Sequence, residues 1–149
     1  MNVLFLTMSS RIDVKERGIY AELMKKFLDE KHSVYIVNPS ERRKGEPTSL
    51  VTENGVNYLH VRTLNVTQTN VIEKGLGQMT MELLFKKAIK KYLGNVKFDL
   101  ILYSTPPITF TNVVKYAKKQ NQNAISYLLL KDIFPQNAVD LGMMTKSGV

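Results

Sequence analysis

The sequence contains no cysteine. Disulfide frameworks, thiolate zinc sites and cysteine nucleophiles are therefore excluded as explanations of its fold or chemistry. Disulfides persist mainly in oxidising compartments, so their absence is compatible with a reducing, cytosolic setting. Long apolar runs are missing too, since no stretch approaches the roughly 18 residues that span a bilayer. The opening residues also lack the basic region and the apolar length of a secretory signal.

Acidic side chains are in the minority. Lys and Arg number 21 against 13 Asp and Glu, which gives a formal net charge of +8. This excess favours anionic partners such as phosphates, nucleic acid or acidic lipid headgroups. Nucleic acid is not expected, because the basic residues are not interleaved with aromatic residues that look exposed and no recognisable binding module is present. The 149 residues fit a single domain.

Expected strands and helices alternate along the chain. Continuous apolar runs predict strands buried on both faces, and apolar residues at helical spacing predict the helices between them. The Asp13-Val-Lys-Glu16 segment has the pattern of a capping box, so the first helix is expected directly behind it. Pro107 suits the first turn of the third helix. The expected strands cover 2–7, 33–37, 99–103 and 124–130, and the second helix is expected to cover about 80–93.

The apolar stripes of the three helices predict which faces pack on the sheet. They are Ile19, Tyr20, Leu23, Met24, Phe27 and Leu28 in the first helix, Leu84, Phe85, Ala88, Ile89 and Tyr92 in the second, and Phe110, Val113, Val114 and Ala117 in the third.

A small hairpin is expected between the second strand and the long helix. Glu53-Asn54-Gly55 separates two short apolar segments, 50–52 and 56–61. Asn-Gly readily takes the positive φ angles of a tight hairpin turn.

Repeated β–α units predict an α/β, Rossmann-like fold, with an open, mostly parallel sheet and helices on both faces. The five parallel strands are expected in the order 3-2-1-4-5, with the hairpin as an extra edge feature. Ligands of such sheets sit beyond the carboxyl ends of the strands, where the strand order reverses. The loops expected to carry function are therefore 8–17, 104–107 and 131–135.

The first of these loops contains two hydroxyls, Ser9 and Ser10, and then Arg17 and Gly18 near a helix start. A helix start offers free N–H groups and a positive dipole end, which suits a phosphate. The loop matches neither the Rossmann glycine fingerprint nor a P-loop. The alternative is a solvated loop with a helix cap.

The other two loops carry hydroxyls and a charged pair. Ser104 and Thr105 stand at the mouth of a buried strand and are candidates for substrate binding or for capping the next helix. Asp132 is a candidate acceptor anchor or base, because a carboxylate there can accept a hydrogen bond from a sugar hydroxyl or take its proton. Lys131 would keep that carboxylate ionised and is a candidate phosphate contact. The alternative for Asp132 is a helix N-cap.

Neither histidine has a carboxylate or second histidine at ligand spacing, so surface or packing roles are expected for His32 and His60, and no metal site is predicted. Four lysines on the outer face of the long helix are candidates for contact with an anionic membrane surface. An ordinary solvated helix face is the alternative. These lysines are Lys86, Lys87, Lys90 and Lys91.

Two segments resemble a known family. Ser104-Thr105-Pro106-Pro107-Ile108-Thr109-Phe110 and the run from Asp132-Ile133-Phe134-Pro135 to Gly142 are similar to motifs of bacterial group 1 glycosyltransferases. These are retaining, GT-B-type enzymes, particularly those of capsule and O-antigen polysaccharide biosynthesis. The opening strand and Arg17-Gly18, where the family often has Gly-Gly, are also similar, so that the resemblance spans the chain.

The resemblance implies that residues 1–149 form the N-terminal, acceptor-side domain of such an enzyme and that the C-terminal, donor-binding domain is absent from this chain. No cofactor is expected on this domain alone, and a sugar nucleotide is the expected donor of the complete enzyme. The acceptor would be a growing polysaccharide or a lipid-linked glycan. The location would be cytoplasmic, with peripheral contact at the inner face of the plasma membrane. The chain alone is expected to be inactive.

Three alternatives remain open. The chain is either a fragment of a longer enzyme or one subunit of a split glycosyltransferase. In a different class, it is a flavodoxin-like ligand-binding or signalling module. A response-regulator receiver would want acidic residues after the first strand, where Met8-Ser9-Ser10 stands, and a flavodoxin would want a hydroxyl-rich loop with glycine there.

Overall fold

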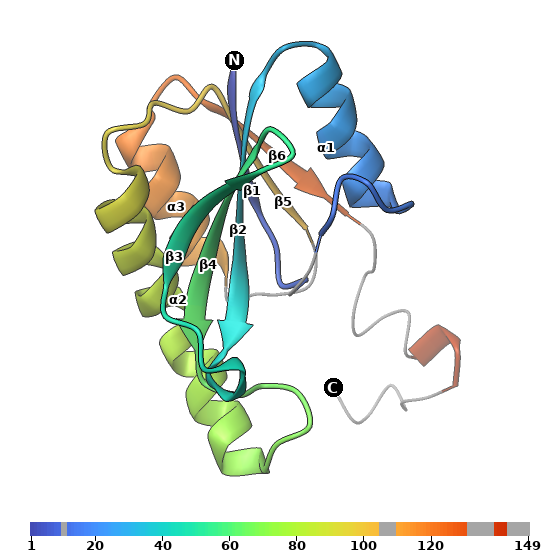
Figure 1. The fold of residues 1–149 in the computed structure, drawn as a ribbon. Coiled ribbons are helices and arrows are strands. Elements are labelled where there is room, and N and C mark those ends of the chain that lie inside the picture. The colour runs from blue at the N-terminus through green and yellow to red at the C-terminus, as the bar shows by residue number, and fades with distance from the viewer. Residues whose placement is uncertain (10–11, 105–109, 131–138, 143–149) are drawn as a thin grey trace.

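The computed structural model describes residues 1–9, 12–104, 110–130 and 139–142 (Figure 1). In chain order the elements are β1 (Asn2–Leu6), α1 (Ile19–Asp29), β2 (Ser33–Glu41), the 3-10 turn η1 (Arg42–Lys44), β3 (Ser49–Glu53), β4 (Val56–Thr63), α2 (Val71–Leu93), β5 (Leu100–Ser104), α3 (Thr111–Gln120) and β6 (Ile125–Leu129).

The strands form one sheet in the order β3-β4-β2-β1-β5-β6. All neighbouring pairs are parallel except β3 and β4, which are antiparallel. The predicted 3-2-1-4-5 order of the parallel strands is therefore confirmed, and the hairpin forms the extra edge. Its turn is built as expected, with φ angles of 50° at Asn54 and 80° at Gly55. Such angles suit this dipeptide.

Helices cover both faces of the sheet, α1 on one side and α2 with α3 on the other (Figure 1). Alternate residues of each strand face opposite sides, so the sheet divides the core in two. Phe5 and Ile36 pack with Met24 of α1, whereas Leu4 and Leu59 pack with helices α2 and α3. The predicted stripes are confirmed in all three helices, with the exception of Ile19, which is 73% exposed.

The predicted start of α1 is wrong. Asp13 does not cap a helix. Its Oδ1 accepts from the backbone N of Lys15 at 2.9 Å, and its carbonyl accepts from the N of Glu16 at 3.0 Å. These bonds close a local turn, which Asp side chains support as readily as a helix cap. Gly18 then stands in extended conformation, and α1 begins at Ile19.

The predicted start of α2 is also wrong, because the helix begins at Val71 rather than near Thr80. Asn70 caps it, with its side chain accepting from the backbone N of Glu73 at 2.7 Å. Gly75 and Gly77 lie within these first turns, and glycine disfavours helix interiors by about 1 kcal/mol. Their presence hid the helix start. The predicted end at Leu93 is confirmed.

The last strand, β6, lies at the edge of the sheet and pairs with β5. Ile125 and Tyr127 are exposed on it. The expected helix start at Pro107 falls outside the described residues.

Candidate functional site

Four polar residues form one row across the carboxyl end of the sheet. Asn38 pairs with His60 in the register of β2 and β4. Leu6 of β1 pairs with Val37 of β2 and with Tyr103 of β5. One residue further along each strand, Thr7 therefore lies level with Asn38 and with Ser104. The backbone continues this register, because Thr7 N donates to Val37 O at 3.1 Å. We call this set, in sheet order His60, Asn38, Thr7 and Ser104, the polar row.

The polar row ends an otherwise apolar face. Side chains two residues apart on a strand share a face, so the preceding row on the α1 side is Tyr58, Ile36, Phe5 and Leu102, and the one before it is Val56, Val34, Val3 and Leu100. These apolar side chains belong to the core beneath α1. The α1 face of four adjacent strands thus changes from apolar to polar at one level.

Most of the polar row is buried: Thr7, Asn38 and Ser104 are at most 7% exposed, and His60 is half-buried. Buried polar groups need hydrogen-bond partners, and the row has them at its centre. The hydroxyl of Thr7 accepts from the backbone N of Ser9 at 3.1 Å. Nδ1 of His60 lies 2.9 Å from Oδ1 of Asn38.

A small cavity opens beside the row. It has a volume of about 150 Å³ and lies between the loop that follows β1 and the strands β2 and β4. The loop contributes Ile12 and Asp13, and the strands contribute Asn38, Tyr58 and His60. The hairpin turn adds Glu53 and Asn54. The cavity is therefore lined by two carboxylates as well as by the Asn38–His60 pair.

The state of the His60 ring follows from its surroundings. Burial is the largest influence on the pKa of His60 and lowers it. Glu46 and Glu53 act in the opposite direction with less effect than burial, and Lys44 adds the smallest contribution, which also lowers the pKa. The imidazole is therefore neutral at pH 7. An amide oxygen can only accept a hydrogen bond, so Nδ1 carries the proton and donates to Asn38. Nε2 is then an acceptor. The ring also stacks on Tyr58, with centroids 5.8 Å apart and planes 7° from parallel.

Of the residues predicted from the sequence to bind a ligand, Ser9 and Ser104 lie at this edge. Ser9 follows Thr7 by two residues in the chain, and Ser104 lies next to Thr7 on the neighbouring strand β5. Arg17 and Gly18 are exposed at the start of α1. Gly18 brings no capping side chain, and a methyl group placed on it would meet nothing within 4 Å. Ser10, Thr105, Lys131 and Asp132 lie outside the described residues.

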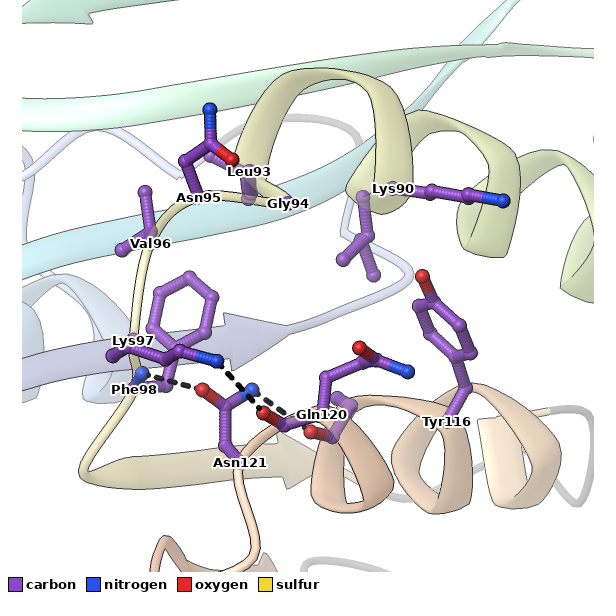
Figure 2. A pocket seen from close by; sticks show the side chains of 12 residues that line it. Lys90, Leu93, Gly94, Asn95, Val96, Lys97, Phe98, Tyr116, Gln120 and Asn121 are labelled. Atoms are coloured by element: carbon purple, nitrogen blue, oxygen red, sulfur yellow. Dashed lines mark hydrogen bonds between the residues drawn. The ribbon is translucent and has the colours of Figure 1, made fainter.

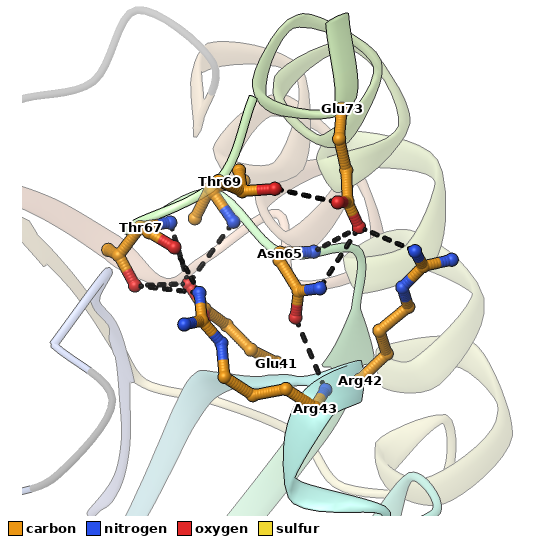
Figure 3. A network of polar contacts seen from close by, with 8 residues as sticks. Glu41, Arg42, Arg43, Asn65, Thr67, Thr69 and Glu73 are labelled. Carbon is orange, nitrogen blue, oxygen red and sulfur yellow. Dashed lines mark hydrogen bonds and ion pairs between the residues drawn. The ribbon is translucent and has the colours of Figure 1, made fainter. Parts of the chain in front are cut away.

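Beyond the ends of β2 and β4, two arginines are held by two glutamates (Figure 3). Glu41 accepts from Val66 N at 3.1 Å and from Thr67 N at 2.9 Å, and its Oε2 lies 2.6 Å from Arg43. The Thr67 hydroxyl donates to the same carboxylate at 2.7 Å, and Arg43 also donates to the carbonyl of Thr67. Burial works to raise the pKa of Glu41, but these hydrogen bonds and the Arg43 charge outweigh it and lower that pKa.

Glu73 ties the start of α2 to the same region (Figure 3). It accepts from the Thr69 hydroxyl at 2.6 Å and from Asn65 Nδ2 at 3.0 Å, and it lies 2.9 Å from Arg42. The Thr69 bond is the main reason why the pKa of Glu73 is lowered. The guanidinium groups of Arg42 and Arg43 are thus engaged by protein carboxylates, so this network anchors the loop.

A larger cavity of about 490 Å³ lies at the opposite, amino end of the sheet, between the ends of α2 and α3 (Figure 2). Asn121 is one of the polar residues that line it. Its Oδ1 accepts from Phe98 N at 2.8 Å, and its Nδ2 donates to Ala117 O at 2.9 Å. These bonds join the end of α3 to the start of β5, which gives Asn121 a structural role.

The described residues contain no group of His, Cys, Asp and Glu arranged to hold a metal ion. The polar row itself is uncharged, with two hydroxyls, an amide and a neutral imidazole. Such a set can exchange hydrogen bonds with a ligand rich in hydroxyls.

Thr7, Asn38 and His60 were not predicted as site residues. The signal was present in part, because each follows an apolar residue two positions earlier on a predicted strand. Placing these three residues in one row requires the register of two strand pairs, β1 with β2 and β2 with β4, and the sequence pattern does not specify register. His60 was expected to pack or lie on the surface, and it is half-buried beside the cavity.

Comparisons with protein-family models, with curated proteins and with solved structures found no match. A functional proposal therefore rests on the geometry of the sheet edge and on the sequence motifs.

Proposed function

We propose that this chain is the acceptor-binding half of a GT-B-type glycosyltransferase. The complete enzyme would move a sugar from a sugar nucleotide to a growing polysaccharide or lipid-linked acceptor. The observation that carries the proposal is the polar row at the carboxyl edge of a Rossmann-like sheet. In the sequence, the two segments that resemble group 1 glycosyltransferases directly follow the last two parallel strands.

The chemistry of the row suits a sugar. Hydroxyls of a glycan both donate and accept, and the row offers both functions, including the acceptor Nε2 of His60 and the hydroxyl of Ser104. Asp13 adds a carboxylate at the cavity. Uncharged groups on a buried ledge would orient an acceptor without binding the diphosphate of the donor.

Other residues would act on the reaction itself. Asp132, a carboxylate that follows the last parallel strand in the sequence, would serve as an acceptor anchor or base, with Lys131 next to it in the chain. Arg17 and Gly18, at the uncapped start of α1, would lie close to the donor diphosphate held by the other half. The donor half is either a further domain of the same polypeptide or a second subunit. Catalysis needs donor and acceptor held together, so this half alone would show no transfer.

A receiver-type signalling module fits the same fold less well. Receivers use carboxylates at the ends of the first and third parallel strands, whereas Thr7 follows β1 and Thr63 ends β4. Glu41, at the end of β2, is engaged by Thr67 and Arg43.

The test is an NMR titration of the isotopically labelled chain with soluble oligosaccharides, with sugar nucleotides and with flavin mononucleotide. Oligosaccharides are expected to shift the amide signals of Thr7, Ser9, Asn38 and Ser104. His60→Gln should weaken this binding at least tenfold, about the value of a hydrogen bond to a buried group. His32→Gln, which changes the other histidine of the chain, should leave it unchanged.

Two results would contradict the proposal. One is turnover of sugar nucleotides by this chain alone, which would mean that the donor site is here. The other is tight binding of flavin at the polar row, which would favour the flavodoxin-like alternative.

A further inference from the structure

The outward face of α2 carries an apolar stripe. Ile72, Leu76, Met79 and Leu83 are spaced by four, three and four residues, which places them on one side of a helix. Their exposed fractions are 77%, 51%, 78% and 55%. At about 1.5 Å of rise per residue, the stripe is roughly 16 Å long. The opposite side of the helix packs on the sheet through Met81 and Phe85.

The same side of the helix continues with lysines. Advancing 100° per residue, Lys86, Lys87 and Lys90 follow Leu83 on the outward side, and Lys87 and Lys90 are exposed. Lys91 is turned further round the helix, and its ammonium lies 5.1 Å from the centroid of the Tyr92 ring. We call the seven residues Ile72, Leu76, Met79, Leu83, Lys86, Lys87 and Lys90 the outward stripe.

The two acidic residues of α2 bind groups that lie away from this face. Glu73 binds Thr69 and Arg42, and Glu82 accepts from Nδ2 of Asn112 on α3 at 2.8 Å. The outward stripe thus presents apolar and basic side chains without a carboxylate. The first turns of α2 also reach beyond the carboxyl ends of β2 and β4 (Figure 1).

We propose that the outward stripe of α2 docks this protein on an anionic lipid surface. Apolar residues on one side of a helix, with lysines in line, suit the boundary between acyl chains and anionic headgroups. The described residues include no helix long and apolar enough to cross a bilayer, so the contact is interfacial. Charge selects a membrane over a second copy of the chain. Parallel pairing of two stripes would set lysines against lysines, and antiparallel pairing would set lysines against apolar side chains. The proposal does not depend on the proposed glycosyl transfer.

Docking would bring the carboxyl edge of the sheet close to the membrane, since the apolar part of the stripe lies at that end of α2. An acceptor linked to a lipid could then reach the polar row. In this arrangement α2 lies along the surface, and the Asn121 cavity, which Lys90 also lines, lies at the other end of α2 from the stripe's apolar part.

The experiment is cosedimentation of the full chain with vesicles of phosphatidylcholine alone and of phosphatidylcholine mixed with phosphatidylglycerol, each at low and high salt. Binding is expected for the mixed vesicles and should weaken at high salt. Each lysine near an anionic surface contributes about fivefold to the affinity. Lys86→Gln/Lys87→Gln/Lys90→Gln should therefore weaken binding roughly a hundredfold. The control with three exposed lysines on the α1 side, Lys15→Gln/Lys25→Gln/Lys26→Gln, should weaken it far less.

A second variant tests the apolar part. Met79→Ser/Leu83→Ser should lower binding to mixed vesicles at least tenfold, whereas Ile19→Ser/Leu141→Ser, which removes two residues that are both 73% exposed elsewhere, should not. All variants should unfold at the wild-type urea concentration, because the changed side chains are exposed or, for Lys86, partly exposed. The proposal is overturned if the wild type fails to bind mixed vesicles at low salt, or if each stripe variant binds like its control. It is also overturned if sedimentation shows a dimer that Met79→Ser/Leu83→Ser abolishes, because a second copy would then cover the stripe.

Discussion

Asn38 and His60 are hydrogen bonded across β2 and β4, with 2.9 Å between Oδ1 and Nδ1. Asn38 is buried, and the bond fixes which nitrogen of the imidazole carries the proton. Asn38→Ala would leave the Nδ1–H of a half-buried ring without this acceptor. We expect the free energy of unfolding to fall by about 1–3 kcal/mol, the cost of a buried polar group that loses its partner. Urea denaturation measures this, and Asn123→Ala, at an exposed position, should change stability by less than about 0.5 kcal/mol.

The same ring predicts a pH dependence. Burial lowers the pKa of His60 in the folded state below its ordinary value of 6.5. As the pH falls below 6.5, the unfolded chain takes up a proton at His60 before the folded protein does. The unfolded state then binds more protons than the folded state, so the free energy of unfolding decreases as the pH decreases through this range. Unfolding curves between neutral and mildly acid pH should show this loss. His60→Gln should remove it and His32→Gln should keep it, and an unchanged slope in His60→Gln would contradict the assignment.

Glu41 anchors the loop after β4 through charge-assisted bonds. Glu41→Gln keeps the shape but places an amide where Val66, Thr67 and Arg43 all donate. We expect a loss of about 2–3 kcal/mol, since hydrogen bonds to a charged group contribute about 1.5–3 kcal/mol. Urea denaturation at neutral pH provides the measurement. Glu53→Gln, an exposed carboxylate on the hairpin, is the control and should remain close to wild type.

A substitution at Thr63 is expected to raise the free energy of unfolding rather than lower it. It is buried at the end of β4, and its hydroxyl has no hydrogen-bond partner among the described residues. Valine has nearly the same shape without the hydroxyl, and burying an unpaired hydroxyl costs about 1–3 kcal/mol. Thr63→Val should therefore raise the free energy of unfolding by about 1 kcal/mol. A loss of stability would mean that the hydroxyl is satisfied in solution.

The two glycines in the first turns of α2 form a matched pair. A Cβ on Gly75 would meet nothing within 4 Å, so Gly75→Ala should stabilise the protein by about 0.5–1 kcal/mol through helix propensity. A Cβ on Gly77 would stand 2.7 Å from Cγ1 of Val66. Valine is stiff at χ1, so the backbone must shift. Gly77→Ala should therefore destabilise by about 1–3 kcal/mol. Thermal unfolding of the two variants should shift in opposite directions.

The sheet order was predictable because apolar runs and helical stripes alternate strongly, and right-handed crossovers leave few topologies. Element starts were less predictable. The Asp13 turn and the Asn70 cap both use short polar side chains that bond the backbone locally, and the sequence does not say which of the two begins a helix. The outward stripe was predicted only in its lysines, because the helix was expected to begin near Thr80, after Gly75 and Gly77.

The location of the candidate site was predictable from the sequence, but not all of the residues that form it were. Loops at the carboxyl ends of strands were expected to carry function, and Ser9 and Ser104 were named there. Asn38 and His60 belong to the strands themselves. They become neighbours only through pairing across the sheet, and a shift of one residue in that register would turn every one of these side chains to the other face.

β1 is bordered by β2 and β5, and Val3 to Leu6 have no exposed surface. Amides in such a strand exchange their hydrogens with solvent only when the whole domain opens. Thr7 comes directly after this buried segment and is itself buried, so its hydroxyl is held in place before any ligand arrives. Binding of a ligand to the polar row therefore costs little free energy for ordering the protein. It also raises the free energy of global opening, so its occupancy can be read as slower deuterium uptake in β1, at amides that the ligand never touches.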